Sequence, residues 1–153
     1  MRVVIVAGGM ENLTRGPYLM QQARGGYRLG NGELIDATVH DGLWCAFENY
    51  HMGNAGEVVA EKYCVSRDAQ DAYAVRSHHR AADATEAGAF TDEILPVALP
   101  QRDGTTKLFD RDESIRPDTN AEALRALKPA FKKDGTVTAG NAPPVNDGAS
   151  ALV

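Results

Sequence analysis

The amino-acid sequence predicts an α/β protein in which helices and a short hairpin lie between two single strands. Three observations predict this fold class. An apolar, β-branched run at residues 3–7 opens the chain, and a second apolar run at residues 149–153 closes it. Polar helix-start signals appear from Asn54 onwards. Residues 94–99 and 105–109 flank a turn that contains glycine, which is the pattern of a hairpin.

The first element is expected to be a buried strand over residues 3–7, stopped by Gly8 and Gly9. Residues 12–34 are rich in Gly, Arg and turn residues, which predicts an extended loop with a short helix at residues 18–23. Because the opening and closing runs both look cut through a core, we expect two unpaired edge strands with apolar faces. Such edges favour association, so the isolated chain is expected to be poorly soluble or to self-associate.

Two helices follow the loop. Asn54, with Glu57 three residues later, has the spacing of a capping box and predicts the start of the first helix. Ser66 predicts the N-cap of a longer helix that runs to about Ala87, with Gly88 as its C-terminal stop. These polar signals are local, so each helix start is predicted without reference to the rest of the fold.

Short signals mark the remaining turns and the last helix. Gly104 can adopt the positive φ that the hairpin turn needs, and Asp134-Gly135 marks another turn. Residues 119–122 form a second capping box, which opens a short helix that Pro129 closes.

Length and charge narrow the classes of function. The 153 residues carry 16 Lys and Arg against 21 Asp and Glu, giving a formal net charge of −5. We expect no nucleic-acid partner, because the chain has no basic cluster that would neutralise phosphates. We expect no membrane partner, because the first apolar run is too short to span a bilayer and no signal-peptide cleavage site follows it. Two cysteines are too few for a disulfide framework, so a cytoplasmic location is expected.

Most residues with reactive side chains have a simpler structural interpretation. Gly8-Gly9 lacks the third glycine of a dinucleotide-binding motif, so a plain turn is the better interpretation. Neighbours on a helix diverge by about 100°, so His78 and His79 cannot chelate one metal and are expected on the surface. A nucleophilic Cys45 or Cys64 would need an activating base and an electropositive setting, so inert cysteines are the better interpretation.

Two segments could bind a ligand. Residues 41–44 and 50–53 gather the only Trp, a His and a Met in a loop punctuated by glycine. An apolar lining with one imidazole suits a thioester or an acyl chain, although a loop plugged into its own core by the Trp and the Met explains the pattern equally well. Residues 128–131 with 135–141 use small residues that would allow close approach of a ligand, but a turn between helix and strand is the simpler interpretation.

Taken in order, these segments resemble the thiolase family. The matching segments are residues 6–12 (VAGGMEN), 41–44, 50–53, 59–63, 66–71, 92–94, 127–131, 134–142 and 146–149. The resemblance runs from one end of the chain to the other. Within the family, His51-Met52-Gly53 is similar to the acetoacetyl-CoA, biosynthetic-type thiolases, which are acetyl-CoA acetyltransferases.

The resemblance implies a thiolase-like α/β fold of two similar halves with an inserted loop domain that holds coenzyme A. Residues 1–12 would be the last strand of the N-terminal half, residues 13–140 the loop domain, and residues 141–153 the start of the C-terminal half. The chain would then cover well under half of a full thiolase. Residues 24–28 would correspond to the loop through which thiolase dimers pair into tetramers.

The same resemblance assigns binding roles. Leu43, His51 and Met52 would line the pocket for the pantetheine arm and the acyl group. Phe131 and Ala139 would form the wall of the pantetheine channel.

Arg116 would stack on or flank the adenine, which suits a planar guanidinium. The chain departs from the family where Pro143, followed by Pro144, replaces a serine, and where Ala123 replaces another. The lost hydroxyl at position 143 predicts a weaker or rearranged hold on coenzyme A.

The reaction implied by the resemblance is acyl transfer between acyl-CoA thioesters, in fatty acid metabolism. Two acetyl-CoA would give acetoacetyl-CoA and CoA, or the reverse thiolysis would occur, with no metal and no tightly bound cofactor. The family's nucleophilic cysteine would lie upstream of Val3 and its catalytic His and second Cys downstream of Val153, so we expect the isolated chain to be inactive. The partners would be acyl-CoA and either further copies, in a dimer or tetramer, or complementing thiolase halves. The alternative is a non-catalytic module, derived from a thiolase, for coenzyme A binding or oligomerisation.

Overall fold

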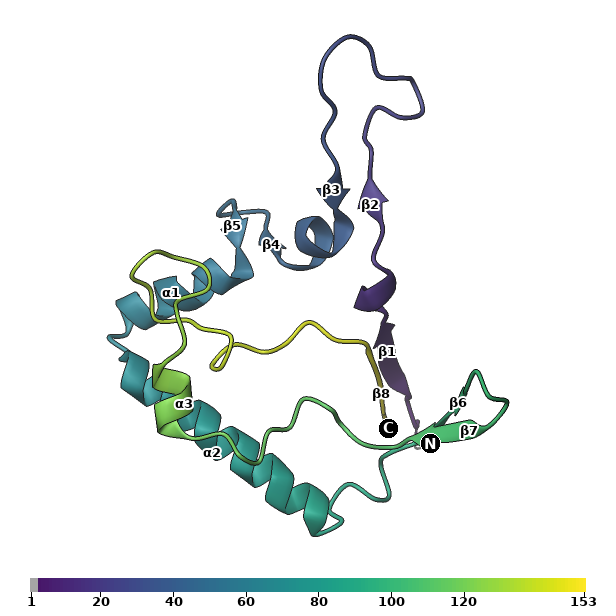
Figure 1. The fold of residues 1–153 in the computed structure, drawn as a ribbon, viewed down its shortest axis with the longest axis vertical. Helices are drawn as coiled ribbons and strands as arrows, with labels where there is room; N and C mark the ends of the chain where they lie inside the picture. The colour runs from purple at the N-terminus through teal and green to yellow at the C-terminus, as the bar shows by residue number, and fades with distance from the viewer. Residues whose placement is uncertain (1–2) are drawn as a thin grey trace.

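The computed structural model describes residues 3–153 as an open frame of short antiparallel ribbons, three α-helices, a short 3-10 helix (η1) and a short π-helix (η2) (Figure 1). The elements in chain order are β1 (Ala7–Glu11), η1 (Leu13–Arg15), β2 (Tyr18–Leu19), β3 (Ile35–Asp36), η2 (Thr38–Gly42), β4 (Trp44–Cys45), β5 (Tyr50–His51), α1 (Met52–Lys62), α2 (Arg67–Glu86), β6 (Val97–Pro100), β7 (Thr106–Phe109), α3 (Ala121–Arg125) and β8 (Gly148–Leu152). Within residues 3–153 the strands pair in twos, as β1–β8, β2–β3, β4–β5 and β6–β7.

The two ends of the described chain pair with each other. Strands β1 and β8 are antiparallel, with Gly9 opposite Ser150. The prediction of a buried strand over residues 3–7 was therefore wrong, because β1 begins at Ala7 and residues 3–6 are exposed. A Cβ at Gly8 would collide with the backbone of Ser150, so the glycine segment fits closely against β8. The prediction of two unpaired strands was also wrong, although β1 and β8 remain exposed along their length.

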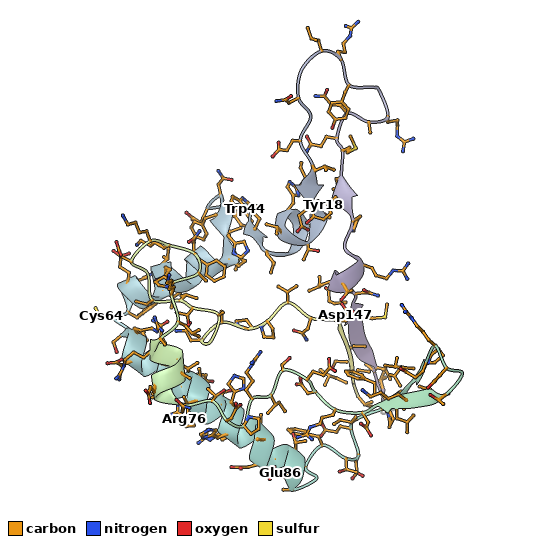
Figure 2. All side chains as sticks on the ribbon, viewed as in Figure 1. Tyr18, Trp44, Cys64, Arg76, Glu86 and Asp147 are labelled. Carbon is orange, nitrogen blue, oxygen red and sulfur yellow. The ribbon has the colours of Figure 1, made fainter. Side chains whose placement is uncertain are left out.

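The segment after β1 is an extended excursion, as predicted, but it contains no helix at residues 18–23. Tyr18 and Leu19 pair instead with Asp36 and Ile35 to form the β2–β3 ribbon, and long-range pairing of this kind overrides local propensity. Figure 1 shows the loop between β2 and β3 projecting from the rest of the molecule. Asp147 accepts a hydrogen bond from the Thr14 backbone N–H at 2.9 Å, which ties η1 to the chain just before β8 (Figure 2).

The ends of α2 confirm two predictions, and the start of α1 corrects one. The Ser66 hydroxyl accepts from the Ala69 N–H at 3.2 Å and starts α2, and Gly88 follows the helix with φ +73°, both as predicted. Helix α1, however, is capped by His51 rather than Asn54. The chain leaves β5 in an extended conformation at His51 and turns into the helix at once, so Asn54 lies inside its first turn.

The last helix and the hairpin depend on similarly local signals. Asn120 rather than Thr119 caps α3, its side chain accepting from the Ala123 N–H at 2.9 Å, and α3 ends at Arg125, before Pro129. The hairpin pairs β6 with β7 across a turn in which Gly104 has φ +83°, as predicted. Asp134 has φ +59°, which confirms the turn expected there.

A small core lies where the three helices meet the loop of residues 129–142. Its buried apolar side chains are Ala60, Leu124 and Val137, and a fourth, Ala82, lies further along α2. The chain exposes 12945 Å² of surface, whereas a compact monomer of its 16.4 kDa mass is expected to expose about 7,500 Å². Much of its apolar surface is therefore left uncovered by its own elements. Among the described residues, no helix combines the length and the apolar character that crossing a membrane requires.

Candidate functional site

Three of the predicted binding residues meet where the β4–β5 ribbon turns into α1. Trp44 pairs with His51 across the ribbon, and the Leu43 carbonyl accepts a hydrogen bond from the Met52 N–H at 2.7 Å. Leu43 and His51 are half-buried, and Met52 is 48% exposed. The ribbon therefore brings these three residues together at the first turn of the helix.

The His51 imidazole has a defined hydrogen-bonding state. Its Nδ1 accepts from the Gly53 backbone N–H at 2.9 Å, which caps α1. An imidazole nitrogen that accepts carries no proton, so the neutral ring has its proton on Nε2. In residues 3–153 no side chain or backbone group hydrogen-bonds to that Nε2–H, so it is available to an incoming acceptor.

Phe131 joins this group from a distant part of the chain. Its ring stacks on His51 with ring centroids 5.0 Å apart and planes 21° from parallel. The same ring lies directly over Gly53, where a Cβ would collide with it. The glycine therefore allows Phe131 to reach the imidazole, and the two rings form a flat wall.

Phe131 is carried by the loop of residues 129–142, the Phe131 loop, which is folded back on itself. Pro129 bridges to Thr138, and the Ala130 N–H donates to the Val137 carbonyl at 2.9 Å. Thr138 is fully buried, while the adjacent Ala139 is exposed. Ala139 therefore lies one residue beyond the bridge that fixes the base of the Phe131 loop.

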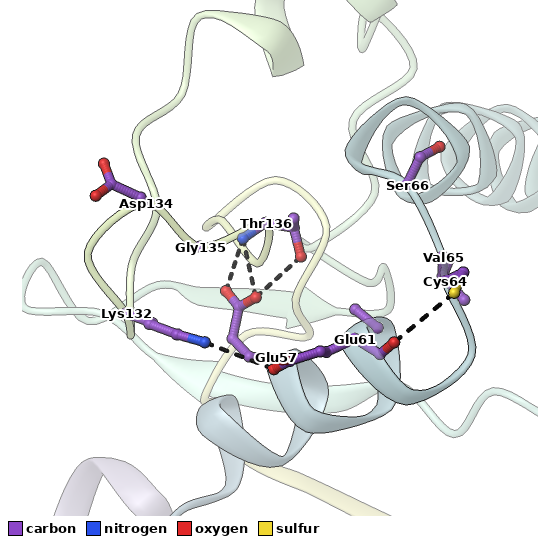
Figure 3. A pocket seen from close by; sticks show the side chains of 10 residues that line it. Glu57, Glu61, Cys64, Val65, Ser66, Lys132, Asp134, Gly135 and Thr136 are labelled. Carbon is purple, nitrogen blue, oxygen red and sulfur yellow. Dashed lines mark hydrogen bonds and ion pairs between the residues drawn. The ribbon is translucent and has the colours of Figure 1, made fainter.

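A buried carboxylate on α1 holds this loop. Glu57 is 6% exposed and accepts hydrogen bonds from the Thr136 N–H at 2.8 and 2.9 Å and from the Val137 N–H at 2.8 Å. The Thr136 hydroxyl adds a further bond at 3.0 Å (Figure 3). Burial, the largest single influence, raises the pKa of Glu57, but these hydrogen bonds and the nearby charge of Lys132 together bring that pKa below its ordinary value of 4.5.

A second buried carboxylate, on α2, holds the far end of the same loop. Asp71 is 4% exposed, pairs with Arg67 at 2.7 Å and accepts from the Asn141 side-chain amide at 3.0 Å. Arg67 also donates to the carbonyls of Leu124 and Leu127. The loop is thus attached to α1 through Thr136 and Val137 and to α2 through Asn141, while Arg67 joins α2 to the chain at α3.

Arg116 lies on a separate segment, which α2 also holds. Its backbone N–H donates to Nδ1 of His78 at 3.2 Å, and Nε2 of His79 lies 2.9 Å from the Thr119 carbonyl oxygen. The Arg116 side chain is exposed. The two histidines, expected only as surface residues, bind residues 116–119. No local pattern predicts these contacts, because the partners are about 40 residues away along the chain.

The remaining predicted positions are exposed. Pro143 lies in the coil between the Phe131 loop and β8, and Ala123 lies on α3. Cys64 is exposed and Cys45 half-buried, and within residues 3–153 neither thiol hydrogen-bonds to a histidine. Nor do the described residues contain a group of three His, Cys, Asp or Glu side chains that could hold a metal ion.

Two shallow, open hollows flank the Phe131 loop. One, of about 280 Å³, lies between the C-terminal part of α1 and residues 132–136, with Glu57 and Cys64 in its lining (Figure 3). The other, of about 410 Å³, is formed by residues 128–134, and Phe131 and three lysines line it. Phe131 therefore borders the second hollow, whereas His51 is in the lining of neither.

Comparisons with known proteins agree on one family. Residues 2–153 match the family model described as Thiolase, N-terminal domain. The chain is 53% identical over 150 residues to an acetyl-CoA acetyltransferase of Pseudomonas aeruginosa, and 48% identical over 150 residues to a probable acetyl-CoA acetyltransferase of Escherichia coli. Each match covers 98% of this chain and 38% of the relative, so the chain spans 38% of the length of these relatives.

Solved structures give the same result. The fold superimposes on an acetyl-CoA acetyltransferase from Syntrophomonas wolfei with a TM-score of 0.90 and 42% identity, covering 95% of this chain and 36% of that one. It superimposes on human mitochondrial 3-ketoacyl-CoA thiolase with a TM-score of 0.88 and 39% identity, covering 95% of this chain and 37% of that one. The fold is therefore thiolase-like, and the chain belongs to the thiolase family.

Proposed function

We propose that this chain supplies the coenzyme A-binding part of an acetyl-CoA C-acetyltransferase. The reaction would be the condensation of two acetyl-CoA to acetoacetyl-CoA and CoA, or the reverse thiolysis. The names of the relatives support the reaction class. The observation that carries the binding role is the wall of Phe131 and His51, beside Leu43 and Met52.

The chemistry of this wall suits a pantetheine arm. Aromatic and thioether side chains give apolar contact to its methylene and dimethyl groups, and small residues such as Ala139 leave room for a narrow chain. The free Nε2–H of His51 can donate to an amide or thioester carbonyl oxygen of the ligand. Arg116 would contact the adenine from the segment held by His78.

The acyl transfer itself needs a cysteine thiolate close to the thioester. Cys45 lies opposite Tyr50, one position along the β4–β5 ribbon from His51, and Cys64 follows α1; in the described part of the chain neither thiol is hydrogen-bonded to a histidine. We therefore infer that the chain does not turn over alone and contributes binding to a larger thiolase assembly. The uncovered surface described above is consistent with such packing against further polypeptide, either as complementing thiolase halves or in a homo-oligomer.

The second candidate function is a stand-alone coenzyme A-binding or oligomerisation module with no catalysis. The observation that favours it is that, in the described residues, neither cysteine thiol is hydrogen-bonded to His51 or to another histidine. Both candidates need the binding site, and they differ in whether added polypeptide restores turnover.

Isothermal titration of CoA into the 153-residue chain tests the shared binding role. Saturable binding by the wild type, weakened in Phe131→Ala and retained in Phe109→Ala, would support it. Phe109 is the matched control because it is an aromatic residue on β7, in the hairpin. An absence of CoA binding would contradict the proposal.

An assay of acetoacetyl-CoA thiolysis then separates the two candidates. Turnover by the isolated chain would contradict the inference that it is inactive alone. Activity restored by mixing the chain with thiolase segments that carry the catalytic cysteines would favour the enzyme part, and CoA binding without any restored activity would favour the module.

A further inference from the structure

The Glu57 carboxylate on α1 binds the backbone of the loop that carries Phe131. We propose that Glu57 is a positioning residue, which sets the affinity of the site for the pantetheine arm by fixing the Phe131 ring against His51. This inference rests on the proposed function, because the ligand is the one proposed above. The spacing of Glu57 from Asn54 predicts only a helix start, so this role in ligand affinity is additional.

The Glu57 carboxylate is a charged group at a buried position. Taking a charged group out of water costs free energy unless hydrogen bonds replace its hydration. Among the described residues Glu57 makes no ion pair within 4.0 Å; Lys132, whose charge lowers the pKa of Glu57, pairs with Glu61 at 3.7 Å instead. Backbone N–H groups and one hydroxyl therefore hold the Glu57 charge. Charge-assisted bonds to two consecutive N–H groups fix the orientation of that backbone strongly.

Backbone hydrogen bonds connect the segment that Glu57 holds to Phe131. Val137, whose N–H binds Glu57, accepts a hydrogen bond on its carbonyl from Ala130, and the Pro129–Thr138 bridge lies beside it. Phe131 is the next residue along the chain after Ala130. The path from the carboxylate to the ring thus runs through hydrogen-bonded backbone over its whole length.

Helix α1 holds both His51 and, through Glu57, the loop that carries Phe131. His51 caps α1 and Glu57 lies in its second turn, so their separation is fixed by helix geometry. Two glycines between them allow the loop to come close, because Gly53 lies under the Phe131 ring and a Cβ at Gly56 would touch Val137 at 3.2 Å. Helix α1 therefore sets the distance between the imidazole and the phenyl ring.

Glu61 provides a matched control for Glu57 on the same helix. Glu61 lies one helical turn further along α1 and is exposed, and among the described residues its carboxylate pairs only with Lys132. Removing the Glu61 carboxylate changes the charge of the helix by the same amount as removing that of Glu57, without touching Thr136 or Val137.

The experiment compares Glu57→Ala with Glu61→Ala in the 153-residue chain. The first readout is the NMR shift of the His51 ring protons, which the stacked Phe131 ring displaces without any ligand. The second is the Kd for CoA by titration calorimetry. We expect Glu57→Ala to lose the displacement of the His51 signals and to raise the Kd at least about tenfold, equivalent to ~1.4 kcal/mol. Glu61→Ala should match the wild type in both.

A conservative variant makes the result specific. Glu57→Gln keeps an oxygen that can accept from both N–H groups but loses the charge, so its His51 shifts and its Kd should lie between those of the wild type and Glu57→Ala. If circular dichroism shows that Glu57→Ala does not fold, Glu57→Gln and Thr136→Val replace it in the test. Each of them weakens the contact between residues 57 and 136 but keeps a side chain of similar size there.

The outcomes separate this inference from the proposed function. Unchanged His51 shifts and an unchanged Kd in folded Glu57 variants would overturn the positioning role while leaving CoA binding intact. If the wild type does not bind CoA, the proposed function fails and this inference fails with it as a statement about affinity. An equal loss of binding in Glu61→Ala would show a general charge effect and would also overturn it.

Discussion

The Phe131 ring stacks on the His51 imidazole, with centroids 5.0 Å apart and ring planes 21° from parallel. His51 ends a two-residue strand and caps α1, whereas Phe131 comes from a loop after α3. Their contact joins the two segments in which the sequence analysis had placed possible ligand-binding residues. It also gives the imidazole a fixed orientation, with Nδ1 bound to Gly53 and Nε2 open.

Gly53→Ala should destabilise the chain and weaken CoA binding. The new Cβ would collide with the Phe131 ring, and overpacking of this kind costs roughly 1–3 kcal/mol of unfolding free energy. Replacing Gly by Ala inside a helix without such a clash instead stabilises by about 1 kcal/mol, so the sign of the change is diagnostic. Urea denaturation measures it. Gly25→Ala, at a position with open space around it, is the control. A more stable Gly53→Ala chain would contradict the stacked geometry.

Acid should remove the stabilisation that Glu57 provides. The folded-state pKa lies below the ordinary value of 4.5, so this contribution is complete above that pH and is lost as the pH falls through the folded pKa. We expect the unfolding free energy of Glu57→Gln to fall less steeply below pH 4.5 than that of the wild type. Glu61→Gln should keep the wild-type slope. Parallel curves for the wild type and Glu57→Gln would count against the Glu57 contact.

The Arg116 side chain should contribute to CoA affinity through the adenine alone. Arg116→Ala is expected to raise the Kd for CoA by about two- to tenfold, the range of one ordinary hydrogen bond or stacking contact. Pantetheine, which has no adenine, should bind both chains equally. An equal loss for both ligands would show that the substitution disturbs the site as a whole, and an unchanged Kd for CoA would remove Arg116 from it.

His78→Ala should reproduce part of the Arg116 effect. The His78 Nδ1 accepts from the Arg116 N–H, so its loss frees the backbone of the segment that presents the guanidinium. We expect a smaller rise in the CoA Kd than for Arg116→Ala, measured by the same titrations. Arg80→Ala, on the same helix and exposed, is the control. If His78→Ala weakens pantetheine binding as much as CoA binding, the effect does not pass through Arg116.

The isolated chain should self-associate. Residues 3–6 and both strands of the β1–β8 pair are exposed, and the whole chain exposes 12945 Å². Sedimentation velocity over a range of concentrations measures the association. A single sharp monomer boundary at high concentration would contradict the expectation.

Local signals in the sequence predicted the elements that depend on few residues. The Ser66 cap and Gly88 stop of α2, and the Gly104 turn of the hairpin, are all present. The strand over residues 3–7 was misplaced because β8 selects its partner through close backbone approach at Gly8, which no local pattern reveals. His51 replaced Asn54 as the cap for a similar reason, since the β4–β5 pairing decides where the helix can begin.

The candidate site was partly predictable. The two segments that contain Leu43, His51, Met52, Phe131 and Ala139 were recognisable from composition and from the family resemblance. Their contact was not, because it depends on Glu57 meeting Thr136 and on Asp71 meeting Asn141 across long stretches of chain. The binding roles of the individual residues stay predictions until a ligand is titrated.

The most direct test of the binding role is an NMR titration of CoA into the isotopically labelled chain. We expect saturable shifts centred on His51, Met52, Phe131 and Ala139, with Arg116 responding to CoA but not to pantetheine. Shifts that are absent at saturating CoA, or that are confined to the β6–β7 hairpin and the β2–β3 ribbon, would contradict it.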